Sequence, residues 1–196
     1  MTYNPRTYWT QRAIRQGPTY VAYGGNLDRA RICTAAFRAA IEEALRDREP
    51  VGWVLDFGCG SGQLASTLAS YGEKYLGVDI SGSGIAQARV TEPDLDFQWL
   101  SEDRIPLRDG KISLAVAVTV FQHIVAPEDW ALWTGELKRV LGPQAPVLII
   151  EAPYSERAVH DHMKLRTPEE IGFALGRPKL TEFPAAERHF VGLFRP

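Results

Sequence analysis

Residues 53–62 constrain this chain more than any other stretch, because they form an apolar strand pattern that ends in a glycine-rich loop. A helical pattern follows directly over residues 63–71, with apolar residues on one face. A strand, a glycine turn and a helix in this order present the free N–H groups of a helix start to a bound nucleoside cofactor. Gly58, Gly60 and Gly62 leave room for a close ligand and permit positive φ.

The spacing of these glycines separates two kinds of cofactor site. A dinucleotide fingerprint, G-x-G-x-x-G, needs a third glycine at position 63, where this chain has Gln63. The chain has G-x-G-x-G instead, preceded by Asp56. A second acid, Asp79, comes 21 residues after Gly58, at the end of the apolar segment 74–79. We expect its carboxylate beside the glycine loop, where a ribose diol can donate hydrogen bonds to it.

The pattern Asp56-x-Gly58-x-Gly60-x-Gly62 with Asp79 closely resembles the cofactor site of the class I S-adenosylmethionine-dependent methyltransferases. The resemblance covers about residues 50–196 and is weaker over residues 1–49. It implies an enzyme that binds S-adenosylmethionine and releases S-adenosylhomocysteine. The residues that we expect to bind this cofactor are Asp56, Gly58, Cys59, Gly60, Gly62, Asp79, Ile80, Ser101, Glu102, Asp103, Thr119 and Gln122.

The resemblance also implies the fold. We expect one methyltransferase domain over residues 1–196, with an N-terminal lid and helix over 1–49 and a Rossmann-like core over 50–196. The core is expected to be a doubly wound α/β fold in three layers, α/β/α. Its mostly parallel seven-stranded sheet is expected to end in an antiparallel C-terminal strand.

Composition excludes several classes of protein. With 196 residues, 45% apolar and 23% charged, the chain suits one domain with one core. A net charge of −2 gives no electrostatic reason to expect nucleic acid or an anionic membrane as a partner. No apolar run approaches the ~20 residues of a membrane span, and no signal region precedes the first helix pattern. Cys33 and Cys59 make no disulfide framework, so we expect a cytoplasmic location.

The N-terminal segment is aromatic and basic. Residues 7–16 predict a short helix that ends at Gly17-Pro18. Tyr8 and Trp9, followed by Arg12, resemble the N-terminal lid of small-molecule methyltransferases. The alternative is a cap that packs these rings on the core. The residues that we expect to bind the acceptor are Tyr8, Trp9, Tyr20, Tyr23 and Tyr154.

Residues 112–120 form a nearly continuous apolar run, which is typical of a buried parallel strand. Thr119, Gln122 and His123 follow at its carboxyl end, so they are expected to face the transferred methyl group. His123 is the candidate general base for an acceptor that must lose a proton, because a neutral imidazole can take one near pH 7. The alternative is a packing or hydrogen-bonding role for His123. Gln122 is a candidate for orienting acceptor or cofactor.

Two further clusters leave alternatives open. In the resembled family an acid after the third strand often binds adenine, and here the usual position falls on Ser101. Either Ser101, Glu102 or Asp103 therefore reads adenine, or the two acids are simply solvent-exposed. His160-Asp161-His162 is a weak metal pattern, so we expect no metal. These histidines are alternatively part of the acceptor pocket.

The C-terminal pattern and the loop after residue 120 narrow the class of enzyme that is expected. Two short strand patterns at 179–183 and 190–194 predict a closing hairpin, which is the methyltransferase ending and not the dehydrogenase one. The chain lacks the Asn/Asp-Pro-Pro-aromatic loop of DNA amino-methyltransferases and the paired glutamates of protein-arginine methyltransferases at this point. A small-molecule acceptor is therefore expected. The alternatives are a protein that binds S-adenosylmethionine without transfer and an NAD-type oxidoreductase; the acceptor atom and the oligomeric state stay open.

Overall fold

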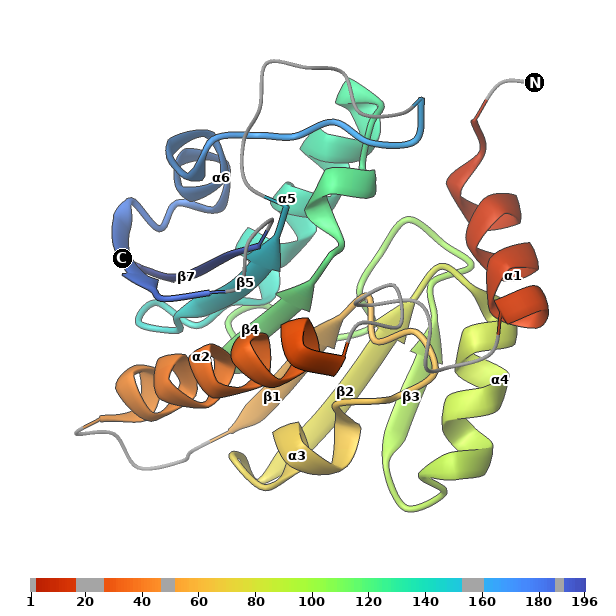
Figure 1. Cartoon of the computed structure of the whole chain (residues 1–196), viewed down its shortest axis with the longest axis horizontal. Coiled ribbons are helices and arrows are strands. Elements are labelled where there is room, and N and C mark those ends of the chain that lie inside the picture. Colours follow the sequence, from red (N-terminus) through yellow and green to blue (C-terminus); the bar gives the residue numbers. More distant parts are fainter. Residues whose placement is uncertain (1–2, 17–26, 47–51, 153–160, 186–188) are drawn as a thin grey trace.

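The computed structural model of the chain describes residues 3–16, 27–46, 52–152, 161–185 and 189–196. A seven-stranded sheet with the order β3-β2-β1-β4-β5-β7-β6 runs through it (Figure 1). Strands β1 to β5 are parallel, and β7 is antiparallel to both of its neighbours, so the expected fold class is confirmed. The strands are β1 (Trp53–Phe57), β2 (Lys74–Asp79), β3 (Asp96–Trp99), β4 (Ile112–Val118), β5 (Val147–Glu151), β6 (Lys179–Phe183) and β7 (Phe190–Arg195).

Helices cover both faces of the sheet and make the three expected layers. One face carries α2 (Leu27–Leu45), α3 (Ala65–Ala69) and α4 (Gly82–Thr91). The other face carries α5 (Pro127–Val140) and α6 (Pro168–Leu175). The first helix, α1 (Pro5–Gln16), lies against α4 and covers no face of the sheet (Figure 1). A short 3-10 turn, η2 (Phe121–His123), follows β4.

The core is divided by the sheet, because alternate residues of each strand point to opposite faces. In β1, Val54 packs with the helices α2, α3 and α4, whereas Leu55 packs with α5 and α6. Both residues are at most 1% exposed. A parallel sheet buried on both faces explains why residues 112–118 read as an unbroken apolar run.

Local capping signals fix the starts of two helices. Ser81 accepts the Gly84 N–H at the start of α4, and Thr167 forms the expected capping box with Glu170 at the start of α6. Helix α3 is shorter than the expected range 63–71, because residues 60–64 form turns before the helix starts. The glycine loop is therefore longer than its sequence pattern indicated.

Of the helices that the structure describes, none combines the length and the apolar character needed to cross a membrane.

Two phenylalanines test the assignment of the core. Phe194 in β7 is 1% exposed, whereas Phe173 on α6 is 86% exposed. Phe194→Ala is expected to lower the free energy of unfolding by about 3–5 kcal/mol, because it removes packing contacts and leaves a cavity. Phe173→Ala, the matched control, is expected to change it by less than about 0.5 kcal/mol. Urea denaturation measures both; equal losses would contradict the burial of Phe194.

Candidate functional site

Three parallel strands carry an acid at or next to their carboxyl ends, at the same edge of the sheet. Asp56 is in β1, Asp79 ends β2, and Glu151 ends β5. Asp56 and Glu151 are each 3% exposed. Ligands of open α/β sheets bind beyond the carboxyl ends of the strands, so these acids mark the edge where a site is expected.

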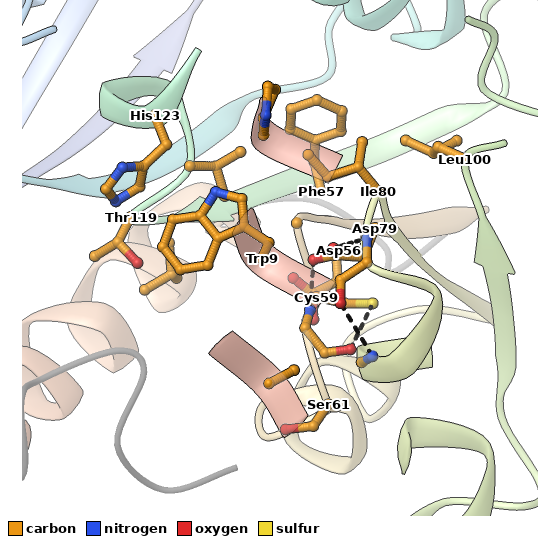
Figure 2. Close-up of a pocket in the computed structure, with 18 of the residues that line it drawn as sticks. Trp9, Asp56, Phe57, Cys59, Ser61, Asp79, Ile80, Leu100, Thr119 and His123 are labelled. Carbon is orange, nitrogen blue, oxygen red and sulfur yellow. Dashed lines mark hydrogen bonds between the residues drawn. The ribbon is translucent and has the colours of Figure 1, made fainter. Parts of the chain in front are cut away.

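A cavity opens at this edge, roofed by α1 (Figure 2). Its floor is the loop after β1, and its walls come from the ends of β2 and β4 and from α4 and α5. Among the residues that line it are Pro5, Trp9, Ala13, Asp56, Gly58, Cys59, Gly60, Asp79, Ile80, Gln87, Leu100, Thr119, Val120, His123, Ile124, Asp129 and Trp133. The structure thus brings most of the predicted cofactor residues together.

The glycine loop is fixed to the end of β2. The Gly58 and Cys59 N–H groups both donate to the Val78 carbonyl oxygen, at 2.8 and 3.0 Å. Gly58 has φ +80°, and a Cβ there would lie 2.3 Å from a methyl carbon of Val120. Gly60 has φ +55°, but a Cβ there would have no protein atom within 4 Å. The first glycine is therefore required by packing, whereas the second leaves open space inside the cavity.

Asp79 is tied to the same loop. Its two carboxylate oxygens accept the Gly60 N–H at 2.9 Å and the Ser81 N–H at 2.7 Å. Burial raises the pKa of Asp79, and these backbone donors act in the opposite direction. Each oxygen keeps a second lone pair, so the carboxylate can accept further hydrogen bonds from a ligand in the cavity.

Asp56 and Cys59 line the cavity but are largely engaged by the protein. The Tyr75 hydroxyl donates to Asp56 at 3.0 Å. Burial raises the pKa of Asp56 to about 7, which this hydrogen bond partly offsets. Burial also raises the pKa of the Cys59 thiol, and a raised pKa keeps a thiol unreactive. Cys59 is therefore a small buried filler within the loop.

The first helix, α1, covers one side of the cavity. Trp9 lies between the turn that carries His123 and the glycine loop (Figure 2). The Arg6 guanidinium donates to the Leu100 carbonyl and forms an ion pair with Asp103 at 3.1 Å. At the other end, the Ser83 hydroxyl donates to the Thr10 carbonyl at 3.0 Å. Helix α1 is thus fastened to the ends of both β3 and α4.

His123 is held at the cavity wall by both ring nitrogens. Its Nδ1 lies 3.0 Å from the His162 carbonyl oxygen, which can only accept, so Nδ1 carries the proton. Its Nε2 lies 3.1 Å from the Gln122 side-chain amide nitrogen, and the Gln122 oxygen accepts the Ala152 N–H at 2.8 Å. Trp9 meets the ring edge-on at 4.6 Å between centroids. Burial lowers the pKa of His123 to about 4, so the ring is neutral at pH 7.

Several predicted residues lie beside the cavity and not in it. Tyr8 stacks on His162 with a centroid distance of 5.0 Å and does not line the cavity. Gly62 and the Gln122 side chain also lie outside the lining. Ser101, Glu102 and Asp103 are exposed and do not line it either, although Leu100 does. The acceptor candidates Tyr20, Tyr23 and Tyr154 lie outside the described residues.

Sequence reasoning missed part of the cavity wall. Gln87, Asp129, Ile124 and Trp133 line it, and none of them has a spacing that relates it to the glycine loop. Glu151 is different, because an acid at the end of an apolar strand is the signal that identified Asp79. The sequence therefore carries the same signal for Glu151.

The cavity residues fit S-adenosylmethionine on two observations. The open space at Gly60 lets a ligand contact the backbone of the loop. The Gln87 side-chain oxygen is buried in the cavity wall without a hydrogen-bond partner among the described residues. An unpartnered buried acceptor of this kind suits a ligand with N–H or O–H donors, and the carboxylates of Asp56 and Asp79 suit a ligand that carries positive charge and sugar hydroxyls.

Within the described part of the chain, no group of three histidine, cysteine or acidic side chains could hold a metal ion. His160 of the weak metal pattern lies outside those residues, and His162 stacks parallel to His123 at 5.7 Å.

Comparisons with known proteins agree with this geometry. Residues 54–144 match the sequence model of a family described as a methyltransferase domain. A probable S-adenosylmethionine-dependent methyltransferase of Mycolicibacterium smegmatis is 27% identical over 124 residues, 63% of this chain and 41% of that protein. A ubiquinone biosynthesis O-methyltransferase of Bradyrhizobium diazoefficiens is 33% identical over 140 residues, 60% of this chain and 54% of that protein. The chain spans about half the length of the curated relatives it matches.

Solved structures share the fold. The PH0226 protein from Pyrococcus horikoshii OT3 has a TM-score of 0.69 at 17% identity, over 94% of this chain and 98% of that one. The DhpI-SAM-HEP complex has a TM-score of 0.69 at 20% identity, over 97% of this chain and 95% of that one. At these identities the likeness concerns the fold.

The lowered pKa of His123 predicts a pH dependence of stability. The unfolded chain takes up a proton at His123 near pH 6.5, whereas the folded chain does so only near pH 4. Stability contributed by the neutral ring is therefore present above about pH 6.5 and is lost as the pH falls toward 4. Between about pH 7.5 and 5 the loss from this group is expected to be about 2 kcal/mol.

His123→Gln is expected to remove this contribution, and urea denaturation of both proteins at the two pH values measures it. Asp56 and Glu151 have raised pKa values, so their effect has the opposite sign: it favours the fold below about pH 4 and is lost as the pH rises toward 7. Both acids remain in both proteins, so the difference isolates His123. An identical pH dependence in the two proteins would refute the lowered pKa.

Proposed function

We propose that this chain, whose residues 54–144 match a methyltransferase domain family, is a class I S-adenosylmethionine-dependent methyltransferase that transfers the methyl group of S-adenosylmethionine to a small-molecule acceptor. S-adenosylmethionine is the cofactor of this family. The observation that carries the proposal is the loop after β1, where Gly60 borders open space and donates its N–H to Asp79 at the end of β2. A ligand on this loop lies within reach of both strand ends.

The proposed binding mode assigns one role to each wall of the cavity. Asp79 accepts hydrogen bonds from the ribose hydroxyls through its remaining lone pairs. Ile80 and Leu100, which line the cavity beside it, pack against the adenine ring. The Gln87 oxygen accepts a hydrogen bond from a donor of the cofactor. Ser101, Glu102 and Asp103 are exposed, so a contact with adenine through their side chains stays a prediction.

Methyl transfer places few chemical demands on the protein. The cofactor supplies a methyl group on a positively charged sulfur, with S-adenosylhomocysteine as the leaving product. The chain has to hold the acceptor in line with that bond and to exclude water. Helix α1 and Trp9 do this by roofing the cavity, while Thr119, His123 and Ile124 form the wall across from the glycine loop. Of the two predicted acceptor residues that the structure describes, Tyr8 and Trp9, Trp9 is the one that lines the cavity, and we propose that it contacts the acceptor.

His123 is the proposed base for an acceptor that must lose a proton. Its Nε2 is the unprotonated nitrogen, and it can take a proton only when the Gln122 amide releases it. A pKa of about 4 makes the ring a weak base in the closed structure. An acceptor that is already deprotonated needs no such step, and His123 then serves only as part of the wall.

Two features support a small-molecule acceptor: the limited access to the cavity and the net charge of the chain. A cavity roofed by α1 admits a small molecule more readily than a folded macromolecule. A net charge of −2 disfavours nucleic acid. Because relatives such as the one from Bradyrhizobium diazoefficiens are named as O-methyltransferases, phenolic and other hydroxyl acceptors are the first to test.

Calorimetry with S-adenosylmethionine, S-adenosylhomocysteine and NAD separates the candidate functions. Binding of both sulfur compounds without NAD binding is expected, because the loop lacks the third glycine of the dinucleotide fingerprint. Incubation of the loaded protein with hydroxyl acceptors is then expected to release S-adenosylhomocysteine. Binding of NAD alone would support an oxidoreductase, and binding of S-adenosylmethionine without turnover across acceptor classes would support a binding protein.

The open space at Gly60 gives a sharp mutational test. Gly60→Val places a branched side chain in the cavity and is expected to weaken S-adenosylhomocysteine binding at least about 100-fold, or about 2.7 kcal/mol. Gly110→Val is the matched control: Gly110 also has positive φ, +68°, and no atom within 4 Å of its Cβ position, but it lies outside the cavity. Both variants place a β-branched residue at positive φ, and calorimetry compares their binding of S-adenosylhomocysteine. Equal affinities would show that the cofactor does not contact this loop.

A further inference from the structure

The turn after β4 forms the cavity wall opposite the glycine loop. Thr119, Val120, His123 and Ile124 line the cavity, and residues 121–123 form the 3-10 turn η2. Thr119 has φ +54°, a left-handed conformation that costs a β-branched residue about 1–2 kcal/mol. A strained turn keeps this shape only if its surroundings hold it in place.

A buried carboxylate holds the N–H end of this turn. The first oxygen of Glu151 accepts the Val120 N–H at 2.7 Å and the Phe121 N–H at 2.8 Å. Its second oxygen accepts the Gln122 N–H at 2.9 Å. Glu151 therefore satisfies the three backbone donors that a 3-10 turn leaves free at its start.

A buried guanidinium holds the carbonyl end of the same turn. Arg166 is 9% exposed and donates to the Phe121 carbonyl at 2.9 Å and to the Ile124 carbonyl at 2.6 Å. Its guanidinium also lies 3.8 Å from the centre of the Trp130 ring. The cation is thus fixed in direction by the carbonyls and by the ring that it covers.

The charges of Glu151 and Arg166 match the polarity of the turn at its two ends. The N–H end of a turn is partially positive and its carbonyl end partially negative, so an anion at the first and a cation at the second both stabilise it. Bonds to charged groups are stronger than neutral ones, and a buried charge is costly unless it is hydrogen-bonded. The two buried charges therefore depend on the turn as much as the turn depends on them.

We propose that Glu151 and Arg166 are positioning residues that clamp residues 120–124 at the cavity wall and thereby hold His123 against the acceptor side. Neither side chain lines the cavity, so each acts through the turn. The statement that His123 faces the acceptor rests on the proposed function. The hydrogen bonds that make up the clamp do not depend on it. The glycine loop and Asp79 lie on β1 and β2 and have no direct bond to either residue, so cofactor affinity is largely independent of the clamp.

The test compares Glu151→Gln with Glu136→Gln in the 196-residue chain. A glutamine has one acceptor oxygen, so it can serve the Val120 and Phe121 donors or the Gln122 donor but not both sets. Glu136 is the matched control, because its carboxylate also accepts a backbone N–H, that of Ile105 at 2.8 Å, and pairs with an arginine, but it lies outside the cavity.

Amide exchange and the titration of His123 are followed by NMR. Glu151→Gln is expected to exchange at least about tenfold faster at residues 120–122 than the unsubstituted protein, because bonds to a charged acceptor are lost there. Water then reaches the ring, and the pKa of His123 is expected to rise by at least about one unit from its value of about 4. Glu136→Gln is expected to leave both readouts unchanged. Unaltered exchange and an unaltered pKa in Glu151→Gln would overturn the clamp.

Arg166→Lys gives a second route if Glu151→Gln does not fold. A lysine ammonium keeps the charge but lacks the fork that reaches two carbonyls, so the same two readouts are expected to change in the same direction. Calorimetry with S-adenosylhomocysteine is expected to show less than about threefold loss of affinity in either variant. A larger loss would overturn the separation of clamp and cofactor. Absence of binding in the unsubstituted protein would overturn the proposed function and leave the exchange result standing.

Discussion

The carbonyl oxygen of Val78 holds the functional edge together, because it accepts the N–H groups of both Gly58 and Cys59. Through this contact the loop after β1 is bonded to the end of β2. The Gly60 N–H adds a further bond between them, because it donates to the carboxylate of Asp79. Two strands of the sheet therefore share one ligand-facing surface. Its shape depends on backbone groups, so it tolerates few side chains: a Cβ at Gly58 would meet Val120, and one at Gly60 would enter the cavity.

The features that sequence predicted are those set by local chemistry. The strand, the glycine spacing and the acid at the next strand end each follow from residues within about thirty positions, and all of them meet at the cavity. The N-terminal lid stays a prediction; the structure shows that Trp9 of this segment lines the cavity. The doubly wound sheet was expected from the family resemblance that these residues carry, and the structure confirms it.

What sequence could not predict are partners far apart in the chain. Glu151 ends an apolar strand as Asp79 does, but its partners lie about thirty residues earlier, and no pattern relates the two segments. Gln87 is one polar residue on a helix, and only the packing of α1 on α4 makes it part of a wall. Asp103 is one of three candidates for reading adenine, which stays a prediction; its carboxylate pairs with Arg6 of α1, a cation that the local sequence does not show.

The acids at this edge differ between the cavity lining and the turn after β4. Among the described lining residues there is no lysine or arginine, whereas Asp56, Asp79 and Asp129 all contribute carboxyl groups. Burial raises the pKa of each of them, so an ionised form is costly until a donor or a cation approaches. A positively charged cofactor lowers that cost at the ends of β1 and β2. At β4, the buried carboxyl of Glu151 lies outside the lining: burial raises its pKa to about 7, while three backbone donors and the nearby Arg166 guanidinium act in the opposite direction. The acids at this edge therefore differ in where they lie: Asp56 and Asp79 border the cavity itself, whereas Glu151 bonds the backbone of the turn that lines it.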